Sequence, residues 1–460
     1  MRNTVRRSLV LVLVVVLFFA GMGILLAEFI LQGSDWVTNK ADRHIYNNGA
    51  IINAGKILDR NKTVLAYSED GKRHFNESAS VRKATLHTVG DTTGFISTGI
   101  HTSYSAKLSG YNMVNGVYNL KKYGQGNDIL LTIDSDVCAT AYNALNGRKG
   151  CISVYNYKTG EVVCLVSAPT FDPENKPSDI DTDESGKYEG IYLNRFFSGL
   201  YTPGSTFKII TSAAAIENIP DIYSRKFTCT GSYRMGTGKV ICNGTHGTIN
   251  FEQALGYSCN STFAQIGEIL GNDILTATAE KLGFNQDMSI GEINVNTSLF
   301  TLPETNPLDL GWASIGQYET LVTPTHMMTL MGAIANGGTA KMPYVIDKMT
   351  SPSGTTVQKT IATNCREINL EVSTAQKLKS MLRSNVNQYY GDYRFPGLSI
   401  CGKTGTAEVA SGKPHAWFVG FSDDQSFPYA FVVILENSGS GSGNAIPVAN
   451  TVLQKIKEKG

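Results

Sequence analysis

The sequence has almost no net charge: 40 Lys and Arg residues stand against 39 Asp and Glu residues, which leaves a formal charge of +1. Proteins that bind nucleic acids usually depend on a positive surface field, so this balance counts against a nucleic-acid partner. Charged residues make up 17% of the chain and apolar residues 42%, which excludes both a disordered tail and a multi-span membrane protein. Proline is scarce, with 14 residues against 46 glycines, and this favours tight turns in a folded chain over a low-complexity linker.

Metal-binding patterns are lacking as well. The eight cysteines form no C-x-x-C pair, and we find no cluster of Cys with His at zinc-ligand spacing. The seven histidines are dispersed, without an HExxH motif. Cys229 and Cys242 flank a Gly-rich stretch and could form a disulfide, but we favour the alternative that all eight cysteines are small buried residues. We therefore predict no metal site.

One long hydrophobic run is present. Leu9 to Ala27 is a run of 19 residues without a charge, which as a helix spans about 28 Å, close to the thickness of a bilayer's hydrocarbon core. Arginines precede the run and acidic residues follow it, so the positive-inside rule places the N-terminus in the cytoplasm and the rest outside. A cleaved signal peptide is the alternative, but it needs a shorter apolar core and a clearer cleavage site. We predict that residues 1–28 form a cytoplasmic tail and a single-pass anchor in the cell membrane.

The remaining chain changes character near residue 126. Residues 29–125 are polar, irregular and rich in Asn, Gly, Ser and Thr, with short strand patterns typical of a small β-rich pedestal. Strand patterns then alternate with helical ones through residues 126–460. The strands are expected at 129–134, 151–155, 162–166, 417–421 and 429–436, and the helices at 137–145, 205–218, 251–270, 322–336, 373–383 and 445–457. Strands at both ends and helices in the middle predict an α+β domain whose terminal parts share one antiparallel sheet.

Ser205-Thr206-Phe207-Lys208 is the first motif that carries chemistry. It follows Pro203-Gly204 and opens an apolar helix, so Lys208 lies one turn after Ser205 on the same face. A desolvated lysine there can lose its proton and activate the serine hydroxyl. The motif alone is weak, because Ser80-Val81-Arg82-Lys83 repeats it and a serine at this place is also a common helix cap.

Two further motifs follow in order. Ser258-Cys259-Asn260 can present a hydroxyl and a carboxamide to one cleft from a loop. Lys403-Thr404-Gly405-Thr406 lies along an expected strand, where the glycine permits close approach of a substrate backbone. Lys158-Thr159-Gly160 repeats the last motif, but only Ser205 is followed by a Ser-x-Asn and then a Lys-Thr-Gly.

This ordered trio is found in penicillin-binding proteins and class A β-lactamases. Residues 126–460 resemble the transpeptidase domain of class B penicillin-binding proteins, and Gly55–Asn61 resembles a membrane-proximal element of that family. The resemblance implies a penicillin-binding protein/β-lactamase-like fold, with an antiparallel sheet and helices on both sides. The segments that carry it are 128–136, 158–173, 194–208, 254–263, 314–338 and 402–420.

The resemblance also implies the reaction, a D,D-transpeptidation of peptidoglycan stem peptides that end in D-Ala-D-Ala. Ser205 would be the acylated nucleophile, Lys208 its base, and Ser258 the proton relay to the leaving amine. Asn260 would hold the substrate amide, Lys403 would add positive potential, and Thr404, Gly405 and Thr406 would bind the terminal carboxylate or its β-lactam mimic. The backbone N–H groups of Ser205 and Thr406 would form the oxyanion hole, and no metal or organic cofactor is needed.

The assignment to class B follows from the length of the chain before the transpeptidase-like domain. The roughly 100 residues between the anchor and residue 126 leave no room for a glycosyltransferase domain. By analogy with class B proteins, a SEDS-type glycan polymerase is the expected membrane partner. One alternative is a membrane-anchored serine β-lactamase, for which Glu292 and Asn296 supply a Glu-x-x-x-Asn segment. Another is a non-catalytic β-lactam receptor or scaffold. His415 lies near the Lys-Thr-Gly strand, where we expect it to be structural.

Overall fold

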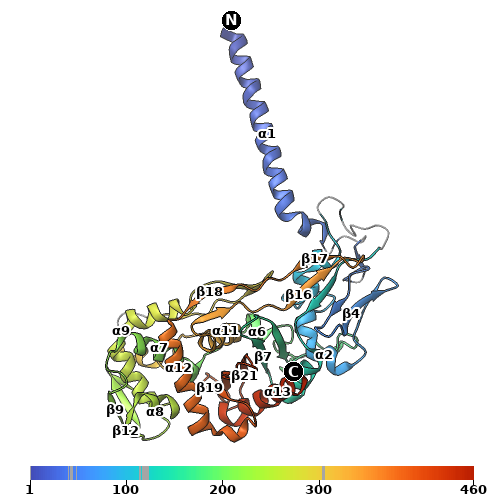
Figure 1. Ribbon diagram of the computed structural model, residues 1–460. Helices are drawn as coiled ribbons and strands as arrows, with labels where there is room; N and C mark the ends of the chain where they lie inside the picture. The colour runs from blue at the N-terminus through green and yellow to red at the C-terminus, as the bar shows by residue number, and fades with distance from the viewer. Residues whose placement is uncertain are drawn as a thin grey trace.

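A single helix, α1 (Arg2–Val37), projects from the body of the molecule (Figure 1). A computed structural model describes residues 2–39, 41, 45–47, 49–112, 116, 124–302 and 306–460. The prediction of a membrane-proximal domain over 29–125 therefore falls partly outside the described residues, at 40, 42–44, 48, 113–115 and 117–123. The apolar part of α1, Thr4–Ser34, is 31 residues long and none of its most apolar stretch is buried, so it is long and apolar enough to cross a membrane.

The core of the body is a five-stranded antiparallel sheet in the order β19-β20-β21-β7-β8. The first two strands along the chain pair with the last three, as the sequence predicts for an α+β domain. Every residue of β8 is buried, and so are all but one each of β7 and β21. Both faces of the sheet are therefore covered. Its strands are β7 (Gly150–Asn156), β8 (Val162–Ala168), β19 (Ile400–Ala407), β20 (His415–Ser422) and β21 (Tyr429–Leu435).

Helices from the middle and from both ends of the domain cover this sheet. Helix α11 (Pro324–Ala335) packs against β7, β20 and β21, and all of its residues are buried. Its start is set by Thr323, whose hydroxyl accepts the backbone N–H of His326 at 3.2 Å, and by proline in the first helical position. Helices α5 (Ser135–Leu145) and α13 (Ile446–Lys459) pack together and against β8 and β21. This arrangement confirms the predicted fold class.

A second sheet, of six strands in the order β17-β16-β6-β3-β4-β5, joins the membrane-proximal region to the rest. Strand β6 pairs in parallel with β3 and antiparallel with β16. Strands on either side of residue 126 thus share one hydrogen-bonded sheet, and the domain boundary drawn there remains a prediction. Its strands are β3 (Ile57–Leu58), β4 (Val64–Glu69), β5 (Lys72–Phe75), β6 (Asp128–Leu131), β16 (Ile346–Thr350) and β17 (Thr356–Lys359).

The remaining elements, which range from two-residue strands to the 22-residue helix α9, surround these sheets. In the described residues the membrane-proximal region adds β1 (Tyr46–Asn47), β2 (Ala50–Ile51), α2 (Ala79–Val89), α3 (Ile100–Ser103) and α4 (Ser105–Leu108). The helical half contains α6 (Arg195–Ser198), α7 (Lys208–Asn218), α8 (Phe251–Gly256), α9 (Asn260–Lys281), α10 (Pro307–Ala313) and α12 (Val372–Ser384). Two-stranded ribbons complete it: β9 (Lys226–Cys229) with β12 (Gly247–Asn250), β10 (Ser232–Met235) with β11 (Gly238–Ile241), β13 (Met288–Ile290) with β14 (Ile293–Val295), and β15 (Thr339–Lys341) with β18 (Asn364–Asn369).

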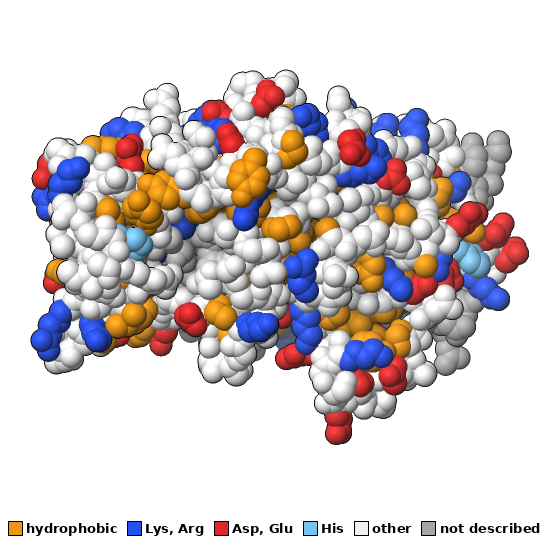
Figure 2. Space-filling model, turned by 90° about the horizontal axis from the view of Figure 1, so that it is seen from below, with side chains coloured by type: hydrophobic (Ala, Val, Ile, Leu, Met, Phe, Trp, Pro, Cys, Tyr) orange, Lys and Arg blue, Asp and Glu red, His pale blue; other side chains and the backbone are white. Residues whose placement is uncertain are grey.

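Side chains of both charge signs are interspersed on the face seen from below (Figure 2). Small orange hydrophobic areas lie between them. This mixture agrees with a net charge of +1 over the whole chain.

Candidate active site

Ser205 lies in a tight turn that leads into α7. A 3-10 turn at Gly204–Thr206 precedes the helix, and Gly204 has a positive φ of 52°. The Gly204 N–H donates to the carbonyl oxygen of Gly316 at 2.8 Å, and any side chain at Gly316 would collide with the Gly204 carbonyl. The backbone before Ser205 is therefore fixed from two directions, while Ser205 itself remains partly accessible.

Ser258 lies in a break between two helices. The sequence predicts one helix over 251–270, but α8 ends at Gly256 and α9 begins at Asn260. Ser258 adopts a φ of 57°, which a continuous helix cannot contain. Cys259 then caps α9, because its sulfur accepts the backbone N–H of Thr262 at 3.4 Å. The prediction of an unbroken helix is wrong here, and the break is what presents Ser258 and Asn260 together.

The Lys-Thr-Gly motif lies in β19 and packs directly on the Ser205 turn. A Cβ atom at Gly405 would lie 2.9 Å from Thr206 Cγ2 and 3.0 Å from the Pro203 carbonyl oxygen, so glycine is needed for this close approach. Thr404 is half-buried and Thr406 exposed. The edge of β19 beside Ser205 is thus open to a ligand.

The Lys208 side chain joins the first two motifs. Its Nζ lies 3.1 Å from Ser205 Oγ and 3.1 Å from Ser258 Oγ. It donates to the Ser258 carbonyl oxygen and to Asn260 Oδ1, each at 2.7 Å. These two atoms can only accept hydrogen bonds, and a neutral amine has two N–H groups for them. Its lone pair is then left to receive a hydroxyl hydrogen.

Lys403 reaches the same oxygen from the third motif. Its Nζ donates to Ser258 Oγ at 3.0 Å and to the carbonyl oxygen of Thr404 at 3.0 Å. Both lysines are fully buried. Burial, and then the charge of Lys403, lowers the pKa of Lys208 well below its ordinary value. Burial also lowers the pKa of Lys403, to about 7. The residues predicted from three distant motifs therefore come together around one serine hydroxyl.

The sequence analysis did not identify Tyr390, which lies in the π-helical segment η2 (Asn385–Gly391). The Tyr390 hydroxyl accepts from Lys403 Nζ and from the Thr404 backbone N–H, each at 3.4 Å. No motif points to it, since a tyrosine 13 residues before Lys403 carries no recognisable pattern. The Tyr390 hydroxyl thus contacts the first two residues of the Lys-Thr-Gly segment.

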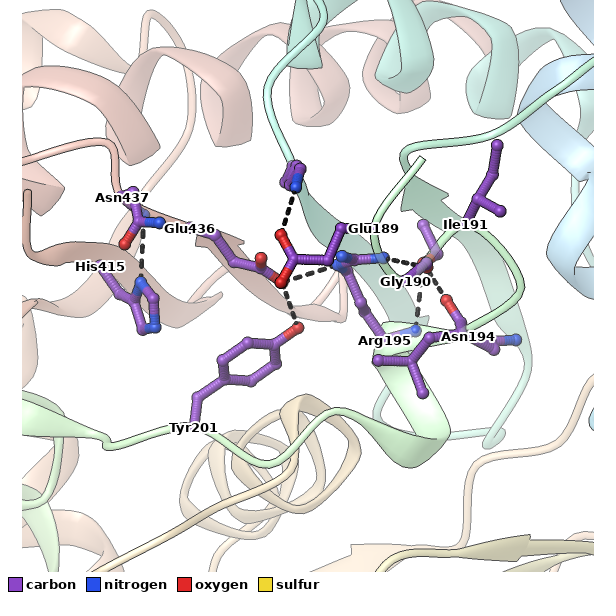
Figure 3. A network of polar contacts seen from close by, with 12 residues as sticks. Glu189, Gly190, Ile191, Asn194, Arg195, Tyr201, His415, Glu436 and Asn437 are labelled. Atoms are coloured by element: carbon purple, nitrogen blue, oxygen red, sulfur yellow. Dashed lines mark hydrogen bonds and ion pairs between the residues drawn. The ribbon is translucent and has the colours of Figure 1, made fainter. Parts of the chain in front are cut away.

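A polar network holds the segment before Ser205 against the central sheet (Figure 3). Arg195 Nε pairs with Glu436 Oε1 at 2.7 Å, and the hydroxyl of Tyr201 donates to the same oxygen at 2.7 Å. His415 stands at the edge of this network, where its Nδ1 accepts the Asn437 backbone N–H at 3.1 Å. Its ring packs edge-on against Tyr201. These contacts support the structural role expected for His415.

Glu292 and Asn296 lie away from these contacts. The Glu292 N–H donates to the hydroxyl of Tyr104, in the membrane-proximal region, at 2.8 Å. The Asn296 side chain donates to the Ser198 carbonyl oxygen at 2.8 Å. Glu292 is exposed, and the polar contacts of Ser205, Lys208 and Ser258 are made with other residues. The geometry does not favour the β-lactamase alternative.

Comparisons with known proteins agree with this geometry. Residues 150–456 match the family model described as the penicillin binding protein transpeptidase domain. Over 401 residues the chain is 27% identical to the peptidoglycan D,D-transpeptidase PbpA of Mycolicibacterium smegmatis, which covers 80% of this chain and 81% of that one. Over 353 residues it is 30% identical to stage V sporulation protein D of Bacillus subtilis, covering 72% of this chain and 53% of that one.

Solved structures show the same fold. The D,D-transpeptidase domain of a peptidoglycan glycosyltransferase from Eggerthella lenta has a TM-score of 0.78 at 27% identity, covering 88% of this chain and 98% of that one. An imipenem acyl-enzyme complex of penicillin-binding protein A from M. tuberculosis has a TM-score of 0.78 at 24% identity, covering 88% and 98%. The predicted architecture is confirmed by these likenesses.

Proposed function

Because the chain belongs to the penicillin-binding protein transpeptidase family, we propose that Ser205 carries the acyl group in its reaction. The protein is a class B peptidoglycan D,D-transpeptidase, as the matched domain and the named relatives indicate. The observation that supports Ser205 is the position of Lys208 Nζ, 3.1 Å from its hydroxyl and from that of Ser258. The second serine–lysine tetrapeptide, at Ser80, has no comparable set of contacts: Ser80 Oγ is buried without a hydrogen-bond partner among the described residues.

In the acylation step, neutral Lys208 takes the proton of Ser205 Oγ as that oxygen attacks the carbonyl carbon of the penultimate D-Ala. The C–N bond to the terminal D-Ala then breaks, and the proton passes through Ser258 to the leaving amine. An amine of a second stem peptide attacks the resulting ester, forms the cross-link and returns the hydrogen to Ser205. Every bond that forms and every proton that moves is accounted for by these side chains and the two stem peptides, so the reaction needs no external acid or oxidant.

The backbone N–H groups of Ser205 and Thr406 would bind the oxyanion that forms during the attack. The Ser205 turn and β19 pack closely, since a Cβ atom at Gly204 would lie 2.8 Å from the Thr406 carbonyl oxygen. Losing one donor of this kind typically costs about 2.7–4 kcal/mol of transition-state stabilisation. One donor belongs to the Ser205 turn and the other to β19. The close packing of these two backbone segments therefore supports the proposed oxyanion hole.

The substrate would lie along β19. Lys403 attracts its terminal carboxylate, Thr404 and Thr406 offer hydroxyl groups to it, and Gly405 keeps the strand close to the Ser205 turn. Asn260 Nδ2 donates one hydrogen to the Ile241 carbonyl oxygen at 2.9 Å. Its second hydrogen is available for a substrate carbonyl. A β-lactam imitates the same acyl donor, so we expect it to acylate Ser205 and remain bound.

We further propose that α1 anchors the protein in the cell membrane with the N-terminus in the cytoplasm. The apolar helix and the preceding arginines support this orientation.

A SEDS-type glycan polymerase is the partner we propose, contacting the anchor and the membrane-proximal region. Co-purification with and without α1 tests that partner separately from catalysis.

Labelling of the full-length protein with a fluorescent penicillin tests the nucleophile. We expect covalent labelling of the wild type, none of Ser205→Ala, and unchanged labelling of the matched control Ser80→Ala. Labelling that persists in Ser205→Ala would refute the assignment.

Nitrocefin hydrolysis separates a transpeptidase from a β-lactamase. A stoichiometric burst is expected from a transpeptidase, and sustained turnover from a β-lactamase.

A further inference from the structure

A cavity of about 120 Å³ lies in the membrane-proximal region, and none of its lining residues belongs to the three motifs around Ser205. Its wall is formed by the residue after α1, by β5, by the loop after α2, and by α3 and α4. In Figure 1, α1 meets the body on the side of β4 and α2. The polar side chains in the wall include Tyr46, Arg73, Asp91, His101, Thr102 and Ser105.

Arg73 is a buried cation whose hydrogen bonds all go to uncharged groups. It is 9% exposed, and its Nε donates to His101 Nε2 at 2.9 Å. Its Nη1 donates to the carbonyl oxygens of Ala54 and Gly55, at 3.1 and 2.8 Å, and to the Ser68 hydroxyl at 3.1 Å. The third nitrogen, Nη2, carries two N–H groups and has no hydrogen-bond partner among the described residues.

The Arg73 guanidinium keeps its charge at this position. Burial, against the attraction of Asp128, lowers the pKa of Arg73 to about 9, which is still above neutral pH. Burial, and after it the charge of Arg73, lowers the pKa of His101 to about 3. His101 is therefore neutral, with Nε2 as an acceptor and Nδ1 donating to the Gly90 carbonyl oxygen at 2.9 Å. A buried charge without an opposite charge in contact is unfavourable, so this cation favours a bound anion.

The carboxylate in the cavity wall is already engaged elsewhere. Asp91 accepts the backbone N–H groups of Phe95 and Ile96, at 3.1 and 2.8 Å, and the hydroxyl of Thr93. These bonds hold the carboxylate within its own loop.

A second polar atom in the wall lacks a partner. Thr102 Oγ1, in α3, is buried and makes no hydrogen bond within the part of the chain that the structure describes. Arg73 belongs to β5, on another side of the cavity. Two unpartnered donors from separate elements thus belong to residues that line one cavity.

The proposed anchoring by α1 would place this cavity close to the bilayer surface. Thr38 lies in the wall, and its carbonyl oxygen accepts the Tyr46 hydroxyl at 2.8 Å. The apolar stretch ends at Ser34 and its charge-free part at Ala27. At a rise of 1.5 Å per residue, Thr38 then lies about 6–16 Å beyond the apolar stretch. The headgroup layer is about 5–8 Å thick, so lipid phosphates lie at or near this level.

We propose that this cavity binds one phosphate group through Arg73 and Thr102. The two hydrogens of Arg73 Nη2 and the Thr102 hydroxyl would donate to its oxygens, since arginine is a preferred partner of phosphate in proteins. A water molecule takes up about 30 Å³ of liquid, so the cavity has room for a group the size of a few waters and not for a nucleotide. The phosphate group is that of a lipid headgroup or of inorganic phosphate, which present the same kind of oxygen. Once bound, it would join β5 to α3.

Thermal unfolding of the full-length protein in a non-ionic detergent tests the site without a membrane. At constant ionic strength, inorganic phosphate should raise the unfolding midpoint in a saturable way. Thr102→Val should weaken the apparent phosphate affinity about tenfold, because a hydrogen bond to a charged group is lost. The matched control is Thr88→Val, which removes another unpartnered buried hydroxyl, outside the cavity, and should keep the wild-type affinity.

His101→Glu gives an independent test. This substitution places a carboxylate beside Arg73 Nε, where His101 Nε2 now lies at 2.9 Å. Without phosphate the variant should unfold at a higher temperature than the wild type, because the buried cation has gained a partner. Its midpoint should no longer respond to added phosphate.

Nanodiscs separate the two sources of the phosphate group. For a lipid headgroup, the wild type should unfold at a higher temperature in discs that contain phosphatidylglycerol than in pure phosphatidylcholine, and inorganic phosphate should add nothing in the former. For inorganic phosphate, the rise should be the same in both kinds of disc. Either pattern supports the site, provided that Thr102→Val reduces it.

Three results would overturn the proposal. The first is a midpoint that responds to neither phosphate nor phosphatidylglycerol, which would mean that water alone solvates Arg73. The second is an equal response in Thr102→Val and Thr88→Val. The third is a response to acetate at lower concentrations than to phosphate, which would assign the cavity to a carboxylate.

Discussion

Lys208 and Lys403 direct their side-chain nitrogens at one oxygen, the hydroxyl of Ser258, from 3.1 and 3.0 Å. Two like charges this close disfavour each other, and both side chains are fully buried. Burial, and after it the charge of Lys403, lowers the pKa of Lys208. These contacts support the proposed division of roles, in which Lys208 acts as the neutral base and Lys403 as the cation that attracts a carboxylate.

This division predicts a bell-shaped pH dependence of β-lactam acylation. The rate should rise with pH as Lys208 loses its proton, and fall as Lys403, with a pKa of about 7, loses its charge. In Lys403→Met the repulsion is gone, so the Lys208 pKa rises and the acid limb moves to higher pH. Stopped-flow acylation of both proteins across pH measures the shift, and an acid limb that stays in place contradicts the proposed coupling.

Removing the base should stop the reaction without unfolding the protein. Lys208→Ala is expected to lower the acylation rate constant by about 10²–10⁴-fold, the range typical of general-base catalysis. Lys83→Ala, in the second Ser-x-x-Lys pattern, is the matched control and should acylate at the wild-type rate. Equal loss in both variants would show that the effect is not specific to the site.

Tyr390→Phe tests the hydroxyl behind the Lys-Thr-Gly segment. Its removal leaves the Thr404 N–H without the partner at 3.4 Å, and losing such a hydrogen bond costs about 1 kcal/mol. We expect acylation about fivefold slower and a small decrease in stability. Tyr389→Phe is the control, since that ring stacks edge-on against Tyr257 and supports no contact of Lys403. Identical rates for the two variants would exclude a positioning role for Tyr390.

The ion pair between Arg195 and Glu436 should matter for stability. The Arg195 side chain is 3% exposed, so Glu436→Gln leaves a buried guanidinium without its charge partner. We expect a loss of about 3 kcal/mol in the free energy of unfolding. Asp179→Asn, which disrupts an exposed pair with Lys187, should cost less than about 0.5 kcal/mol. Urea denaturation of both variants gives the comparison, and similar midpoints would refute a stabilising role for the buried pair.

Much of the central fold was predictable because its elements are long and strongly patterned. The apolar runs near Ile152, Val163 and Val432 indicated buried strands, and the structure has them there. The order of the three motifs favours Ser205 over Ser80 as the nucleophile, and the assignment stays a prediction. Periodicity alone could not show the break at Ser258, because a helix-compatible sequence continues through it and only tertiary contacts impose the positive φ.

The gathering of Cys229, Cys242, His246 and Cys259, whose ligand atoms lie within 4.8 Å of one another, was missed for a different reason. Cys242 and His246 stand four residues apart, a spacing that zinc ligands do use. Cys229 and Cys259 complete the group from 13 residues on either side, and that separation resembles no short motif. The sequence analysis found no cysteine clustered with histidine at zinc-ligand spacing along the chain, whereas folding brings these four side chains together. The sequence analysis missed Tyr390 for the same reason, since its partners in β19 become its neighbours only after folding.

The parallel pairing of β3 with β6 bears on how the protein can be shortened. Ile57 and Leu58 lie opposite Ile129 and Leu130, so a version cut at residue 126 would lose its neighbour on one side of β6. The newly bared edge would offer unsatisfied amides and apolar side chains to other molecules, a common route to aggregation. Soluble versions that lack the anchor should therefore begin before residue 55, where the strand and its turn are retained.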